Sequence, residues 1–312
     1  MILRDRDPVR PSAPLPACGI GPFAWMLLVS FALAGCGGFA AVSQPRFEEV
    51  LLQGEGREKM LLIDIWGPIS NVPLLVPGQG VIPGMTARVR QELEIAFQDP
   101  HIRGVLLRID SPGGTITDSD VIYNSLMEFK KSKRVKIVAS MGDLAASGAL
   151  YVAMAADEIY AHPTTITGSI GVIMPHTDYS GLAEKLGVRS DPITSGKLKD
   201  VEDPLRPRTE EEEKMLRGIV MKLYEKFIMV VQAGRQKMSE AKVREIADGR
   251  LFTADEAQEL GLIDGVHYLD DTYRRLSTLA GFPENRLVRY TNVWLTGNNI
   301  YSNTFPIEFS RP

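Results

Sequence analysis

Ser147 is the residue whose surroundings say most about chemistry; it lies in the segment MGDLAASGALY of residues 141–151. The apolar run at residues 135–139 predicts a buried strand before it, and residues 149–156 predict a helix after it. Ser147 would stand at this strand-to-helix corner, where the helix dipole favours negative charge on an attacking oxygen. Serine is also a common helix N-cap. The corner therefore predicts either a nucleophile or a cap.

Two glycines follow a second predicted strand. Residues 104–110 (GVLLRID) form an apolar run, and residues 111–115 (SPGGT) come directly after it. Because glycine has no side chain, backbone N–H groups around Gly113 and Gly114 can converge on one point, as an oxyanion hole requires. Pro-Gly-Gly is also ordinary turn chemistry. A serine corner one strand later favours the catalytic interpretation.

A nucleophilic serine needs a neighbouring group that can take its proton. The histidines are His101, His162, His176 and His267. Only His176 is a candidate, because the others precede a predicted strand or lie in predicted loops. A lysine can serve instead when burial lowers its pKa until the amine is neutral. Lys197 and Lys199 are available in TSGKLKD, although lysines are usually solvated, so the base stays open on spacing alone.

Four short motifs occur in order along the chain. They are SPGG at residues 111–114, AASG at 145–148, TGSIGV at 167–172 and SGKLK at 195–199. Their order and intervals resemble those of the signal peptide peptidase A (SppA) family, and the similarity runs from about residue 61 to residue 279. The chain length suits the short, single-repeat form of that family.

The resemblance implies a role for each matching position. Ser147 matches the nucleophile, Lys199 the general base, and Ser169 the serine that orients the lysine amine. The oxyanion hole is implied at the backbone N–H groups of Gly113, Gly114 and Gly148. Lys197 is then a bystander. The implied reaction is hydrolysis of peptide bonds through an acyl-enzyme on Ser147, with cleaved signal peptides as the expected substrates.

The composition argues against several other classes of function. The formal net charge is −4 and no basic stripe is present, which argues against a nucleic-acid partner. No His/Cys spacing suits zinc, so neither a metal nor another cofactor is expected. The only cysteines, Cys18 and Cys36, lie in the first forty residues, so disulfides are not expected to hold the folded body.

The N-terminus predicts membrane attachment. Residues 23–33 are an apolar run that suits a signal peptide and is shorter than the ~20 residues that span a bilayer. The following Leu-Ala-Gly-Cys resembles a lipobox, in which Cys36 would carry the lipid. An uncleaved membrane anchor is the alternative. Both place the catalytic body outside the cytoplasm, in the cell envelope and against membrane lipid.

Strand and helix patterns alternate from residue 61 onward, which predicts parallel strands joined by crossovers. The resemblance narrows this α/β class to the Clp protease/crotonase-like fold, with a mostly parallel sheet, flanking helices and a C-terminal helical segment. Thr209 and Glu212 predict a capping box that opens a long helix. The expected divisions are residues 1–36 for the signal peptide, 37–58 for a tether, 59–284 for the peptidase domain and 285–312 for an extension of unassigned role.

The resemblance also predicts an oligomeric state, and three alternative functions are considered beside it. The resemblance implies a homo-octameric ring in which serine and lysine can come from neighbouring copies. A Clp-like Ser-His-Asp protease would use His176 instead, which leaves Lys199 unexplained. A crotonase-like acyl-CoA enzyme needs no serine at this corner. A non-catalytic lipoprotein on the same scaffold is the third alternative, which labelling of Ser147 by a serine-reactive phosphonate would exclude.

A lysine base makes activity depend on pH. Because the Lys199 amine must be neutral to take a proton, we expect peptidase activity to rise toward alkaline pH. A pH–rate profile with a peptide substrate measures this. Activity that stays flat down to pH ~5, where lysine is charged, would contradict a lysine base.

Overall fold

The computed structural model describes residues 47–76, 80–292 and 300–301. The predicted signal peptide and its Cys36 lie outside the described residues. None of the helices within these ranges combines the length and the apolar character needed to cross a bilayer.

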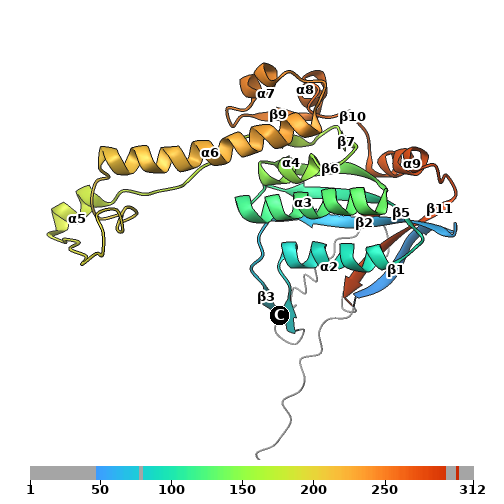
Figure 1. Ribbon diagram of the computed structural model, residues 1–312, viewed down its shortest axis with the longest axis horizontal. Coiled ribbons are helices and arrows are strands. Elements are labelled where there is room, and N and C mark those ends of the chain that lie inside the picture. The colour runs from blue at the N-terminus through green and yellow to red at the C-terminus, as the bar shows by residue number, and fades with distance from the viewer. Residues whose placement is uncertain (1–46, 77–79, 293–299, 302–312) are drawn as a thin grey trace, which may run out of the picture. The chain divides into compact units, whose positions relative to one another are not determined.

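A nine-stranded sheet runs through the described part of the chain (Figure 1). Its main path is ordered β1-β11-β2-β5-β6-β7-β10, and the short β8 and β9 continue from β6. The strands are β1 (Phe47–Gly54), β2 (Glu58–Trp66), β5 (Ile102–Ser111), β6 (Lys136–Ala146), β7 (Glu158–Ala161), β8 (Ile166–Gly168), β9 (Leu251–Thr253), β10 (Gly265–Val266) and β11 (Asn285–Asn292). Only the β1–β11 and β8–β9 pairs are antiparallel within this sheet of described residues. The predicted α/β class with a mostly parallel sheet is confirmed.

Helices cover both faces of the sheet. They are α2 (Met85–Gln98), α3 (Ile116–Lys133), α4 (Gly148–Ala153), α5 (Ser180–Leu186), α6 (Glu210–Gly234), α7 (Glu240–Ile246), α8 (Ala254–Glu259) and α9 (Leu269–Ala280). Alternate residues of a strand face opposite sides. On β2, Leu61 and Ile63 therefore pack with α2 and α3, whereas Leu62 packs with α9. The strands are buried on both faces, as expected for parallel strands between helices.

The outer strands differ from the expected division of the chain. Strand β1 lies within the stretch expected to be a tether, and β11 lies within the expected extension. β11 pairs parallel to β2 and antiparallel to β1, and Leu287 and Val288 are fully buried. Both segments therefore belong to the sheet. Each is rich in polar residues and lacks a clear apolar pattern, so the sequence does not reveal its partner strand.

Helix α6 joins the sheet region to the segment of residues 175–209. Thr209 and Glu212 form the predicted capping box at its start. Toward its other end Phe227 and Val231 are buried, and the Phe227 ring lies 5.2 Å from that of Tyr151 on α4. The helix has 25 residues and is about 37 Å long. Figure 1 shows α5 near its N-terminal end and the sheet near its C-terminal end.

Helix α2 carries a buried carboxyl group, that of Glu92. The side chain of Glu92 on α2 is 4% exposed, and the Arg88 guanidinium lies 2.7 Å from it. Burial raises the pKa of Glu92 to about 7, although Arg88 acts in the opposite direction. The folded state therefore holds a proton on Glu92 that the unfolded chain releases near pH 4.5.

Substituting Glu92 tests this burial. A carboxyl whose folded pKa is raised stabilises the fold below its unfolded pKa, and that contribution is lost as pH rises toward about 7. We expect the stability of wild type relative to Glu92→Gln to fall across this interval, by on the order of 1–3 kcal/mol. Denaturant unfolding of both proteins at pH ~5 and ~8 measures this. An unchanged difference between the two pH values would contradict it.

Candidate active site

Ser147 occupies the corner between β6 and α4, as predicted. Its backbone has φ 53° and ψ −121°, a conformation that non-glycine residues adopt only under constraint. The Ser147 N–H donates to the Gly168 carbonyl at 2.9 Å, and its own carbonyl accepts from the Tyr151 N–H at 3.0 Å. The side chain makes no capping hydrogen bond to α4. Ser147 is therefore the N-cap residue of α4 by position, but its half-buried side chain does not cap the helix and its hydroxyl is available for chemistry.

Three glycines crowd around this corner. A β-carbon on Gly113, whose φ is 93°, would lie 2.6 Å from the Gly148 nitrogen. One on Gly148 would lie 3.3 Å from the Gly114 nitrogen, and one on Gly114 would lie 2.0 Å from the Ile69 carbonyl oxygen. Only glycine allows this approach. The backbone nitrogens of Gly114 and Gly148 thus lie next to each other beside Ser147.

Ile69 fixes the glycine loop in place. Its N–H donates to the Gly113 carbonyl at 2.8 Å, and its carbonyl accepts from the Thr115 N–H at 2.9 Å. Within the described ranges, the N–H groups of Gly114 and Gly148 donate no hydrogen bond to another group of the chain. They can therefore serve two hydrogen bonds to an oxygen placed beside the Ser147 hydroxyl.

Ser169 directly follows β8 and, like Ser147, has a positive φ. Strand β8 pairs with β6 so that Gly168 lies opposite Ala146, which brings Ser169 beside the Ser147 corner. Ser169 has φ 52°, and its N–H donates to the Arg250 carbonyl at 2.7 Å. Sequence reasoning gave Arg250 no role at the site. Its contribution comes from a backbone carbonyl, which no side-chain motif can indicate.

Lys199 lies elsewhere in the same chain. Its side chain is exposed, and its N–H closes a turn onto the Gly196 carbonyl at 3.0 Å. The adjoining Asp200 is joined through Arg206 to Glu212, in the first turn of α6. Within one chain, Lys199 is therefore held near the α6 start.

Ser147 lies against a later part of α6. It lines a pocket together with Leu223 and Phe227. Leu223 follows Glu212 by eleven residues, or roughly 16 Å of helix. The structure therefore brings Ser147, Ser169 and the glycines together but leaves the Lys199 turn of the same chain well away from them.

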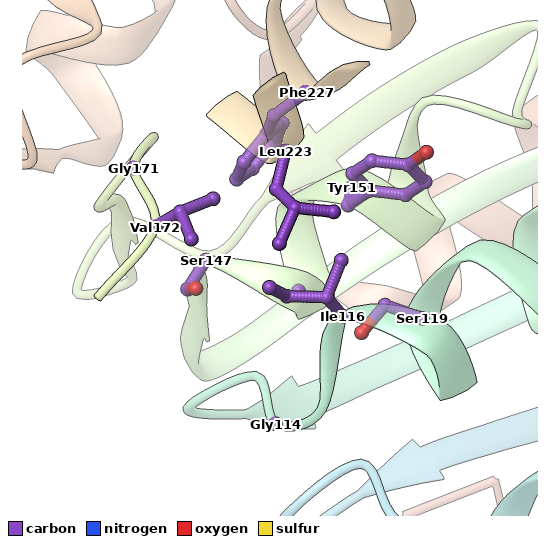
Figure 2. A pocket seen from close by; sticks show the side chains of 10 residues that line it. Gly114, Ile116, Ser119, Ser147, Tyr151, Gly171, Val172, Leu223 and Phe227 are labelled. Carbon is purple, nitrogen blue, oxygen red and sulfur yellow. The ribbon is translucent and has the colours of Figure 1, made fainter. Parts of the chain in front are cut away.

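The pocket beside Ser147 is mostly apolar (Figure 2). It holds about 310 Å³ of space, part of it open to solvent. The side chains that line it are Ile116, Ser119, Ser147, Tyr151, Val172, Leu223 and Phe227, together with Gly114, Gly148 and Gly171. The Tyr151 hydroxyl donates to Asp120 at 2.6 Å, which directs its polar atom away from the apolar lining. Such a cavity fits an apolar side chain next to a bond held at Ser147.

No histidine belongs to this pocket. His176 lies near Asp178, in the segment before α6. His162 packs against the Tyr268 ring at 5.5 Å, and burial lowers the pKa of His162. Lys197 is paired with Glu211 on α6. Among the described residues, no group of three or more His, Cys, Asp or Glu side chains could hold a metal ion.

Comparison with known proteins identifies the family. The family model described as Peptidase family S49 matches residues 129–282. A Synechocystis sp. protein provisionally named a protease is 43% identical over 74% of this chain and 78% of its own length. An Enterococcus faecium protein provisionally named signal peptide peptidase SppA is 34% identical over 78% of this chain and 70% of its own.

Two further comparisons are more distant. The chloroplastic serine protease SPPA of Arabidopsis thaliana is 33% identical over 75% of this chain and 34% of its own length. A ClpP1 mutant structure from Listeria monocytogenes aligns with TM-score 0.44 and 13% identity over 68% of this chain and 93% of that one. On the sequence matches, the chain belongs to peptidase family S49 and is an SppA-type serine peptidase.

Proposed function

We propose that the protein is a Ser–Lys peptidase whose catalytic pair forms between two copies of the chain. Ser147 would come from one copy and Lys199 from its neighbour. The observation that carries this proposal is the separation within one chain. The Ser147 corner is fully formed beside Leu223 and Phe227, whereas the matching lysine is held near the start of α6.

In the proposed reaction, Lys199, Ser147 and the glycine N–H groups act one after another. The neutral Lys199 amine takes the Ser147 proton, and the hydroxyl oxygen attacks the peptide carbonyl. The N–H groups of Gly114 and Gly148 hold the negative oxygen of the tetrahedral intermediate. The amine then returns its proton to the leaving nitrogen, and water hydrolyses the acyl-enzyme by the same route. Ser169, which follows Gly168 at the corner, would orient the incoming amine.

Exposed apolar side chains support the assembly of several copies of the chain. Many lie on the segment before α6 or on the first half of that helix. They are Ile173, Met174, Tyr179, Leu182, Leu186, Val188, Ile193, Leu205, Ile219 and Met221. Exposed apolar residues gathered in this way are typical of a surface that another protein covers. A second copy resting here would bury them and receive the Lys199 turn, and repetition of the contact would build the octamer expected from the family.

The pocket and the N-terminal sequence support signal peptides as the substrate. The apolar lining around Leu223 and Phe227 accepts the aliphatic side chains that dominate the apolar core of signal peptides. We propose that such peptides are degraded at a membrane of the cell envelope. The body would lie outside the cytoplasm, attached through lipid on Cys36 or through an anchor.

Mixing two inactive variants tests the shared pair. Ser147→Ala and Lys199→Ala should each lose peptidase activity alone. Co-assembled, they should recover a fraction of it, because some neighbouring copies then supply one intact serine and one intact lysine. Peptide hydrolysis measures the recovery, and Ser147→Ala mixed with the double variant is the control. No recovery in particles shown by native mass spectrometry to contain both chains would contradict a shared pair.

Gly113→Ala tests the glycine corner. The new methyl would lie 2.6 Å from the Gly148 nitrogen and would impose a side chain at φ 93°. We expect kcat to fall roughly 10²- to 10³-fold, as for loss of one oxyanion donor. Gly218→Ala on α6 is the matched control, since a β-carbon there meets nothing within 4 Å. Equal activity of the two variants would contradict the role of the Gly113 loop.

A further inference from the structure

The Arg206 guanidinium joins the Lys199 turn to helix α6. Its Nε donates to the Asp200 carboxylate at 3.0 Å, and its Nη2 donates to the Asp200 carbonyl at 2.9 Å. On the other side, Nη1 and Nη2 donate to the two carboxylate oxygens of Glu212 at 3.0 and 2.6 Å. Asp200 directly follows Lys199 in the chain. A single side chain therefore connects the residue beside the proposed base to a helix.

We propose that Arg206 is a positioning residue for Lys199, which fixes the turn that carries the base against the first turn of α6. This inference rests on the role of Lys199 under the proposed function. Arg206 itself touches neither Ser147 nor the pocket beside it. It acts through the backbone and side chain of Asp200.

The helix side of this contact is rigid. The Glu212 side chain is only 2% exposed and closes the capping box by accepting from the Thr209 N–H at 2.8 Å. The Arg206 hydrogen bonds are the main cause that lowers the pKa of Glu212 to about 2. Glu212 therefore stays ionised over the pH range in which a lysine base works, and the charge-assisted fork with Arg206 persists there.

The segment that carries Lys199 also contacts residues 179–190, since the Pro204 carbonyl accepts from the Tyr179 N–H at 2.7 Å and the Ser190 hydroxyl donates to Asp203. It consists of short loops closed by local hydrogen bonds, such as the Asp203 N–H to the Asp200 carbonyl at 2.9 Å. Within the described residues, the other ion pair between the turn and α6 joins Lys197 to Glu211, whose side chains are 74% and 55% exposed. Exposed pairs of this kind contribute little. The forked contact of Arg206 is therefore the main restraint that holds the Lys199 turn against α6.

Placement of the base controls the rate. A general base must come within roughly 3 Å of the hydroxyl it deprotonates. A misplacement of about 1 Å can lower the rate about 10²-fold. Arginine suits the task because its planar group can hold two acceptors on different segments at once, which a lysine ammonium holds less well.

A double-mutant cycle tests the proposal. The variants are Arg206→Ala, Lys199→Ala and the two combined, and the readout is the rate at which a peptidyl phosphonate labels Ser147 in the assembled full-length protein. We expect Arg206→Ala to slow labelling roughly 10²-fold and to slow Lys199→Ala no further, since the base is then already absent. Arg206→Lys should recover part of the loss. Arg217→Ala is the matched control, because Arg217 pairs with Glu213 on the same helix with both side chains exposed.

The outcomes distinguish the positioning role of Arg206 from the proposed Ser–Lys pair. If Arg206→Ala slows labelling equally with and without Lys199, or leaves it unchanged, the positioning role is overturned while the Ser–Lys pair stands. If Lys199→Ala itself labels at the wild-type rate, the proposed function fails, and the role of Arg206 fails with it. If Arg206→Ala does not assemble, the same cycle is run with Arg206→Lys, which keeps the charge opposite Glu212.

Discussion

The hydrogen bond from the Ser147 N–H to the Gly168 carbonyl, at 2.9 Å, is the contact on which the site depends. It holds a serine in a backbone conformation that the residue would not adopt alone. The bond exists because β6 continues past its pairing with β7 and takes up β8 as a second partner. Ser147, the neighbouring Ser169 and the glycine loop are thus all positioned by the ends of sheet strands, with side-chain support from Ser111, whose hydroxyl accepts from the Gly113 N–H at 3.1 Å.

Local pattern was enough to predict much of this arrangement. The apolar run at residues 104–110 lies inside β5, residues 136–139 of the second run begin β6, and the Thr209–Glu212 capping box opens α6 as expected. These features depend on neighbours within a few positions, so the sequence alone carries them. The glycine corner was predicted on a different basis, because Gly113 and Gly148 lie far apart in the sequence. Close packing of Gly113 against Gly148 needs only two short motifs at strand ends that lie side by side.

The remaining features depend on contacts between distant segments. Strands β1 and β11 pair across more than two hundred residues, and neither has a pattern strong enough to reveal its partner. The Arg250 carbonyl contributes to the Ser169 backbone without any side-chain signal. The place of Lys199 is set by the length of α6, which the capping box indicates only at its start. Motif order predicted Lys199 as the base but could not show that it lies far from Ser147 of its own chain.

The position of β11 also has a consequence for how the chain folds. It is the last strand in the described sequence, yet it lies between β1 and β2, the first two to be synthesised. Until it emerges from the ribosome, both early strands present unpaired edges, one of them the strongly apolar β2. Such edges invite association with other chains. Nascent protein is therefore most vulnerable to aggregation just before translation of its C-terminal region is complete, and this is when chaperone protection would matter most.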